Sequence, residues 1–134
     1  MSAFTIGLGC DRGAAPDTVR AAVLAALAEA GATPEQVVAA ASITIKQDEA
    51  ALLAIAGEYG WPLRFYAARE LAAIPVPHPS ATVLRYTGTP SVSEAAALLA
   101  AGAGTPMTAL VVEKLKHRGA DGRHATVSIA RKDS

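Results

Sequence analysis

The sequence predicts an α/β protein with three layers, α/β/α, built on a mainly parallel, mixed sheet of about five strands that ends in an antiparallel hairpin. Short apolar runs without clean polar alternation recur along the chain, as in strands that helices cover on both faces. Alanine- and leucine-rich segments with helical periodicity separate these runs. Near the C-terminus, two strand-like runs flank a turn, which is typical of a hairpin.

Length and composition predict a single domain over 1–134 and exclude several classes of protein. Of the 134 residues, 51% are hydrophobic but only 4% are aromatic, so small aliphatic side chains must build the core. The formal net charge is +0, unlike the basic footprint of a nucleic-acid binder. No apolar run has the length of a membrane span and no signal-peptide pattern is present, so we expect a cytoplasmic protein without a membrane partner. The single cysteine excludes an internal disulfide.

The first part of the chain alternates strands with helices. Residues 3–9 form an apolar run that predicts a strand buried on both faces. The apolar stripe of residues 17–30 predicts a helix that Gly31 ends. A capped turn at 33–36 then leads to a second strand at 37–45.

The middle of the chain predicts shorter elements. A helix over 49–59 is stopped by Gly60, and a short third strand follows at 63–66. Residues 68–74 predict one or two helical turns. Three prolines within 75–79 remove backbone donors that a helix interior or a central strand needs, so this segment is expected to be an extended loop.

The last part of the chain predicts two helices and the hairpin. Ser91 and Glu94 have the spacing of a capping box and are expected to open the longer helix. The predicted elements are a short helix at 82–86, a helix that ends near 101, and strands at 107–115 and 125–131 around a turn within 116–123.

Three stretches are expected at one edge of the sheet, where ligands bind in open α/β folds. They are residues 9–13, Ser42 with 46–49, and 88–94, each next to a predicted helix start. Free backbone N–H groups and the helix dipole favour an anion there, and Arg12 and Lys46 add positive charge. The predicted ligand-binding residues are Gly9, Cys10, Arg12, Gly13, Ser42, Lys46, Thr89, Ser91, Val92, Glu94 and Lys114.

Purely structural explanations remain open for several of these residues. Gly7 and Gly9 could serve only to let the strand pack closely on a helix. In the G-x-G-x-x-x-G spacing, Arg12 stands where a dinucleotide fingerprint needs its third glycine, which disfavours a nucleotide-binding module. Asp48 and Glu49 could simply cap the helix that follows them.

Cys10, Asp48 and Glu49 are the candidate catalytic residues. A helix start and Arg12 are expected to lower the pKa of the Cys10 thiol, but the sequence places no histidine to act as its base. The two carboxylates could serve as acid and base. One cysteine and three scattered histidines give no metal-ligand spacing, so neither a metal nor a cofactor is expected.

The stretches 7–13, 42–49 and 88–96 resemble, in that order, the signature segments of the CobE/CbiG C-terminal-domain family of cobalamin (vitamin B12) biosynthesis. The resemblance covers nearly the whole chain and implies a stand-alone member that handles a precorrin intermediate of the aerobic pathway. Longer members of the family hydrolyse the δ-lactone of cobalt-precorrin-5A and release a two-carbon fragment. Thr44 stands where the family often has aspartate, which weakens an enzymatic interpretation.

The resemblance implies a corrin, a tetrapyrrole-derived macrocycle fringed with acetate and propionate groups, as the ligand. Arg12 is expected to hold one carboxylate in a two-pronged contact and Lys46 to act as a point charge. An apolar floor is expected from Leu8, Val92 and the loop around Val76 and His78. Three roles stay open: a binding or accessory protein, a lactone hydrolase or isomerase, and a structural partner of a precorrin methyltransferase.

Overall fold

The computed structural model describes residues 2–132. The strands are β1 (Ala3–Cys10), β2 (Val37–Ile43), β3 (Leu63–Tyr66), β4 (Leu110–Arg118) and β5 (His124–Lys132). The α-helices are α1 (Pro16–Ala30), α2 (Ala50–Tyr59), α3 (Ala68–Ala72), α4 (Ala81–Thr87) and α5 (Ser93–Ala101). Short 3-10 turns are η1 (Pro34–Gln36), η2 (Thr44–Lys46) and η3 (Met107–Ala109). Within the described range, no helix is long and apolar enough to cross a membrane.

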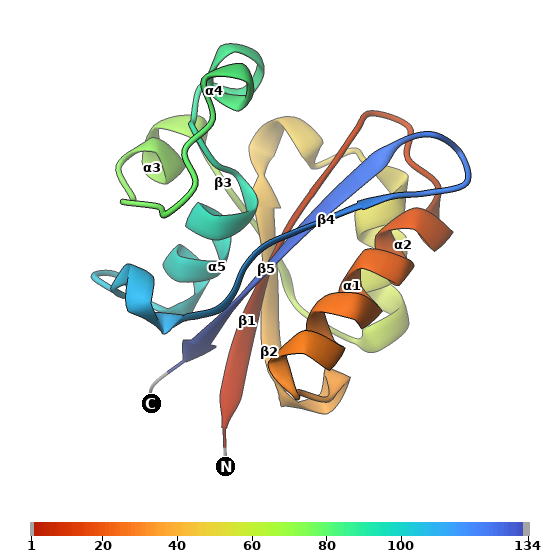
Figure 1. Cartoon of the computed structure of the whole chain (residues 1–134), viewed down its shortest axis with the longest axis horizontal. Helices are drawn as coiled ribbons and strands as arrows, with labels where there is room; N and C mark the ends of the chain where they lie inside the picture. Colours follow the sequence, from red (N-terminus) through yellow and green to blue (C-terminus); the bar gives the residue numbers. More distant parts are fainter. Residues whose placement is uncertain (1, 133–134) are drawn as a thin grey trace.

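The five strands form one mixed sheet in the order β3-β2-β1-β5-β4 (Figure 1). β1 pairs in parallel with β2, and β2 in parallel with β3. β5 runs antiparallel to both of its neighbours, β1 and β4. This confirms the predicted α/β class with a terminal hairpin. The hairpin folds back so that its last strand lies beside the first strand of the chain.

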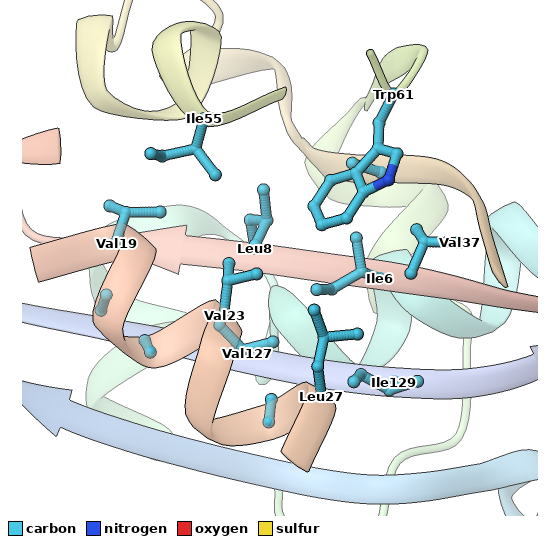
Figure 2. Close-up of a cluster of buried hydrophobic side chains, with 14 of the residues drawn as sticks. Ile6, Leu8, Val19, Val23, Leu27, Val37, Ile55, Trp61, Val127 and Ile129 are labelled. Carbon is cyan, nitrogen blue, oxygen red and sulfur yellow. The ribbon is translucent and has the colours of Figure 1, made fainter. Parts of the chain in front are cut away.

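Helices cover both faces of the sheet (Figure 1). On one face, Ile6 and Leu8 of β1 pack against Val23 of α1 and Ile55 of α2 in the largest apolar cluster (Figure 2). On the other face, Thr5 donates a hydrogen bond to a carbonyl of α5 at 2.7 Å. Side chains alternate along β1, so one of its faces packs against α1 and α2 and the other packs against α5.

Gly7 explains how closely α5 approaches the sheet. A Cβ atom at this position would lie 1.8 Å from the backbone oxygen of Ser93 and 2.8 Å from the backbone nitrogen of Ala97. Only a residue without a Cβ atom allows this contact between β1 and the first turns of α5. The packing explanation for Gly7 is therefore confirmed, and the same contact places the start of α5 at the edge where β1 ends.

Three element boundaries differ from the prediction. β2 ends at Ile43 because the chain turns into η2, which leaves Ile45 exposed instead of continuing the strand. β4 begins only after η3 and extends to Arg118, so the hairpin turn is shorter than predicted. The prediction that Ser91 and Glu94 form the capping box of this helix is wrong, because α5 begins at Ser93 and its N-cap is Val92.

Candidate ligand-binding site

A pocket of about 410 Å³ opens where β1 and β2 end and α5 begins. Its walls come from the β1 end, the β2–η2 segment, α4, the start of α5 and the β4–β5 hairpin. The lining residues are Gly9, Cys10, Asp11, Ile43, Lys46, Thr82, Val83, Tyr86, Thr87, Val92, Ser93, Lys114, Lys116, His124 and Thr126. The pocket thus lies at the carboxyl edge of the parallel strands, where ligands bind in open α/β sheets.

Gly9 keeps the floor of the pocket open. A Cβ atom there would lie 2.7 Å from Oγ1 of Thr126 and 3.9 Å from Cγ1 of Val92. Any larger residue would therefore fill the space between these two side chains. Gly9 thus leaves space in the pocket, whereas Gly7 allows α5 to pack closely on β1.

One wall of the pocket comes from α4, none of whose residues is buried. Ser80 caps this helix by accepting a hydrogen bond from the backbone N–H of Val83 at 3.2 Å, and Gly88 ends it in a left-handed conformation with φ 84°. Tyr86 presents a side chain that is 74% exposed at the pocket. The sequence predicted the helix but gave no signal that it forms a pocket wall.

Three lysines line the same pocket. Lys46 comes from η2, and its Nζ lies 4.0 Å from Oε1 of Glu49. Lys114 and Lys116 stand two positions apart on β4, so their side chains emerge on the same face of the sheet. The pocket therefore joins apolar walls to a concentration of positive charge, an arrangement that suits a ligand with carboxylates on an apolar body.

Glu49 is buried outside the pocket lining and binds the loop that follows β1. Its carboxylate accepts a hydrogen bond from the backbone N–H of Gly13 at 3.0 Å and lies 3.7 Å from Nη1 of Arg12. Although Glu49 is the N-cap residue of α2, its side chain makes no cap hydrogen bond. The helix-cap explanation is wrong for this residue, because the carboxylate points to the loop after β1.

Arg12 is occupied by protein groups and lies outside the pocket lining. Its Nη1 donates to Asp48 at 2.9 Å and its Nη2 donates to the backbone oxygen of Ile45 at 2.7 Å. The side chains of Arg12 and Asp48 are 56% and 76% exposed. The hydrogen bond from Arg12 lowers the pKa of Asp48. The pair thus links the loop after β1 to the η2 segment on the outer surface.

Cys10 lines the pocket, but its thiol is not activated. Burial raises the pKa of Cys10 to about 11, although the nearby Lys46 acts in the opposite direction. The expected lowering of this pKa is wrong, because removal of the side chain from water outweighs the positive charges. A histidine does share the pocket, namely His124, which the sequence did not place near Cys10.

Asp11 and His124 form a pair at the pocket wall. Oδ2 of Asp11 accepts hydrogen bonds from the backbone N–H of His124 at 2.8 Å and pairs with its Nδ1 at 3.1 Å. Burial raises the pKa of Asp11, but the hydrogen bonds from His124 outweigh it and the net shift is downward. Asp11 is therefore a carboxylate that orients the imidazole.

Four predicted residues are buried outside the pocket lining: Ser42, Thr89, Ser91 and Glu94. Ser42 donates to the backbone oxygen of Leu8 at 2.7 Å and so ties β2 to β1. Ser91 donates to Oε1 of Glu94 at 2.9 Å, while Oε2 has no hydrogen-bond partner within residues 2–132. Burial raises the pKa of Glu94. The Ser91–Glu94 hydrogen bond thus joins the segment before α5 to the first turn of that helix.

The predicted floor needs a correction. Leu8 is fully buried in the cluster on the opposite face of the sheet, so it cannot contact a ligand in this pocket. His78 pairs with Glu113 at 2.9 Å, and both His78 and Val76 lie outside the lining. Val92 does line the pocket.

Five predicted ligand-binding residues therefore meet in the pocket, and six do not. Those that line it are Gly9, Cys10, Lys46, Val92 and Lys114; those outside it are Arg12, Gly13, Ser42, Thr89, Ser91 and Glu94. Asp11 lies within the predicted stretch 9–13, and Lys116 is a neighbour of Lys114 that also adds positive charge, whereas His124 and Thr126 were not predicted. Lys116 lies just beyond the predicted strand 107–115, but its spacing of two residues from Lys114 was a usable signal once the strand extends to Arg118. The position of His124 depends on the strand order. No cluster of three or more potential metal ligands occurs among residues 2–132.

Fold and pocket together define a class: an α/β domain with a lysine-lined pocket at the carboxyl edge of a mixed sheet. Residues 4–130 match the family model described as "Cobalamin synthesis G C-terminus". The chain belongs to this family of cobalamin biosynthesis proteins, as the sequence resemblance predicted.

Individual relatives agree with this assignment. The chain is 36% identical over 129 residues to Protein CobE of Sinorhizobium sp, a match that covers 95% of this chain and 79% of the relative. It is 41% identical over 102 residues to Cobalt-precorrin-5A hydrolase of Priestia megaterium, covering 76% of this chain but only 27% of the hydrolase. The crystal structure of CobE, a protein from the cobalamin biosynthetic pathway, superposes with a TM-score of 0.77 at 35% identity, covering 97% of this chain and 90% of that one.

Proposed function

We propose that this protein binds a precorrin intermediate of the aerobic corrin pathway in the pocket at the carboxyl edge of the sheet. The observation that carries the proposal is the meeting of Lys46, Lys114 and Lys116 in one pocket with apolar walls. A precorrin combines an apolar macrocycle with carboxylates at its rim. Ammonium groups bind such carboxylates as point charges, and apolar side chains cover the ring.

The size of the pocket supports partial insertion of the ligand. A volume of about 410 Å³ accommodates one edge of a corrin with its acid side chains and leaves the rest of the ring at the mouth. Tyr86 of α4, with its highly exposed side chain, is available there to contact the outer ring. Anion-binding backbone groups at the start of α5, next to Val92 and Ser93, add to the attraction for carboxylates.

A second candidate is hydrolysis of a precorrin lactone, which the similarity to Cobalt-precorrin-5A hydrolase favours. The chain matches only 27% of the length of that enzyme, so its activity is no more than a proposal for this chain. The three candidate catalytic residues give it little support. Asp48 and Glu49 lie outside the pocket lining, and the thiol of Cys10 stays protonated at neutral pH because burial raises its pKa to about 11.

Incubation with freshly prepared precorrin-5 or a neighbouring intermediate, followed by absorbance and mass spectrometry, separates these roles. We expect a spectral shift on binding and an unchanged ligand mass. A changed mass would show turnover and favour the hydrolase. No spectral shift, together with co-purification of a precorrin methyltransferase, would overturn the proposal in favour of a purely structural partner.

A further inference from the structure

Asp11 and His124 form a second polar feature of the pocket wall, separate from the three lysines. Besides accepting both N–H groups of His124 through Oδ2, Asp11 donates its own backbone N–H to the backbone oxygen of His124 at 2.9 Å. Backbone and ring of His124 are thus held by one residue. The imidazole is 39% exposed and lines the pocket.

This geometry determines which ring nitrogen can meet a ligand. A carboxylate accepts hydrogen bonds, so Nδ1 of His124 must be the donor to Oδ2 of Asp11. The other ring nitrogen, Nε2, then carries a lone pair in the neutral imidazole and a proton only in the imidazolium. Proton uptake would turn Nε2 from an acceptor into a donor with a positive charge.

The charges around the pocket make that uptake depend on the ligand. Lysines from η2 and β4 line the same pocket as the imidazole, and the thiol on β1 is neutral because of its raised pKa. A bound carboxylate neutralises the ammonium groups and favours the imidazolium, which Asp11 also stabilises. The charged or titratable groups that line the pocket with His124 are Cys10 of β1, Asp11 just after it, Lys46 of η2, Lys114 and Lys116 of β4, and Tyr86 of α4. Arg118 pairs in register with His124, Arg123 precedes it in the chain, and Glu49 lies 4.0 Å from Lys46.

We propose that His124 is a proton-linked binding residue: when a carboxylate-bearing ligand enters the pocket, the imidazole takes up one proton from solvent and donates Nε2–H to the ligand carboxylate. This inference rests on the proposed function. It makes the pocket selective for acid side chains over the corresponding amides. It also makes binding of the acid tighter at lower pH.

Calorimetric titration with dicyanocobyrinic acid, a corrin with free carboxylates, tests the proton linkage. Cyanide occupies both axial positions of the cobalt in this probe, so coordination by an imidazole does not contribute. Heats measured at about pH 7.5 in phosphate and in Tris, whose ionisation enthalpies differ, give the protons taken up per ligand. For the unmodified protein we expect a net uptake of protons on binding and an affinity severalfold higher at pH 6 than at pH 8.

His124→Gln should lose the proton uptake and most of the pH dependence, while keeping the backbone N–H that Asp11 accepts. His117→Gln is the matched control, because His117 lies outside the pocket lining. His117 pairs in register with Ala125, whose side chain belongs to the apolar cluster beneath α1 and α2. Asp11→Asn is a second test that leaves the imidazole in place, and it should reduce the uptake.

Binding without proton uptake, or the same uptake in His124→Gln as in the unmodified protein, would overturn the role of His124 and leave the proposed function intact. Uptake unchanged by Asp11→Asn would overturn the role of the pair. Absence of binding by the unmodified protein would remove the proposed function and this inference together.

Discussion

Replacement of Glu49 by alanine is expected to destabilise the protein through the loop after β1. Glu49 is buried, and its carboxylate accepts the backbone N–H of Gly13 at 3.0 Å. A hydrogen bond to a charged group contributes about 1.5–3 kcal/mol, and the substitution also leaves Lys46, 4.0 Å away, without its counter-charge. We expect a loss of about 3 kcal/mol in the free energy of unfolding, or roughly 10 °C in Tm.

Asp48→Ala is the matched control for this change. Asp48 is the preceding residue, it carries the same charge, and it pairs with the exposed Arg12 at 2.9 Å. Exposed ion pairs contribute little, so its urea midpoint should match that of the unmodified protein. Hydrogen exchange at the Gly13 amide gives a local readout and should accelerate only in Glu49→Ala. Equal urea midpoints for the two variants, or unchanged exchange at Gly13, would refute the anchoring role of Glu49.

Three further predictions concern the buried groups. Gly7→Ala should lower the free energy of unfolding by about 3 kcal/mol, because its Cβ would lie 1.8 Å from the Ser93 oxygen; an unchanged urea midpoint would contradict the tight contact with α5. With its pKa raised to about 11, Cys10 should react with iodoacetamide at pH 8 far more slowly in the folded protein than in urea, and equal rates would contradict its burial. Because burial raises the pKa of Glu94 above its ordinary value of 4.5, the protonated form is favoured in the fold, so stability falls as the pH rises above about 4.5 and the carboxyl ionises. Glu94→Gln should reduce that fall in urea unfolding, and an identical pH dependence would argue against the shift.

The elements of the fold were predictable because their signals are local. Gly31 and Gly60 both adopt left-handed conformations that end α1 and α2, as their positions predicted. Gln36 accepts the backbone N–H of Thr33 at 2.9 Å, so the capped turn before β2 was also readable from the sequence. In each case, residues a few positions apart decide the structure.

The composition of the site was predictable only in part, because it depends on contacts between distant residues. Arg12 has the chemistry for a ligand carboxylate, yet Asp48, 36 positions away, pairs with it instead. Asp11 meets His124 only because β5 lies next to β1, and no local pattern encodes that strand order. Lys46 and Lys114 were found because each follows or lies in a recognisable strand.

Affinity for dicyanocobyrinic acid across lysine variants tests the central claim most directly. Lys46→Met, Lys114→Met and Lys116→Met should each weaken binding roughly tenfold, the loss expected for one charge-assisted contact. Lys132→Met is the control, since Nζ of Lys132 donates to the Ala101 oxygen at the far end of α5, outside the pocket lining. The account predicts weaker binding in the three pocket variants alone, and a further decrease with added salt. The same affinity in all four variants would contradict a lysine-lined binding site for a carboxylate-bearing corrin.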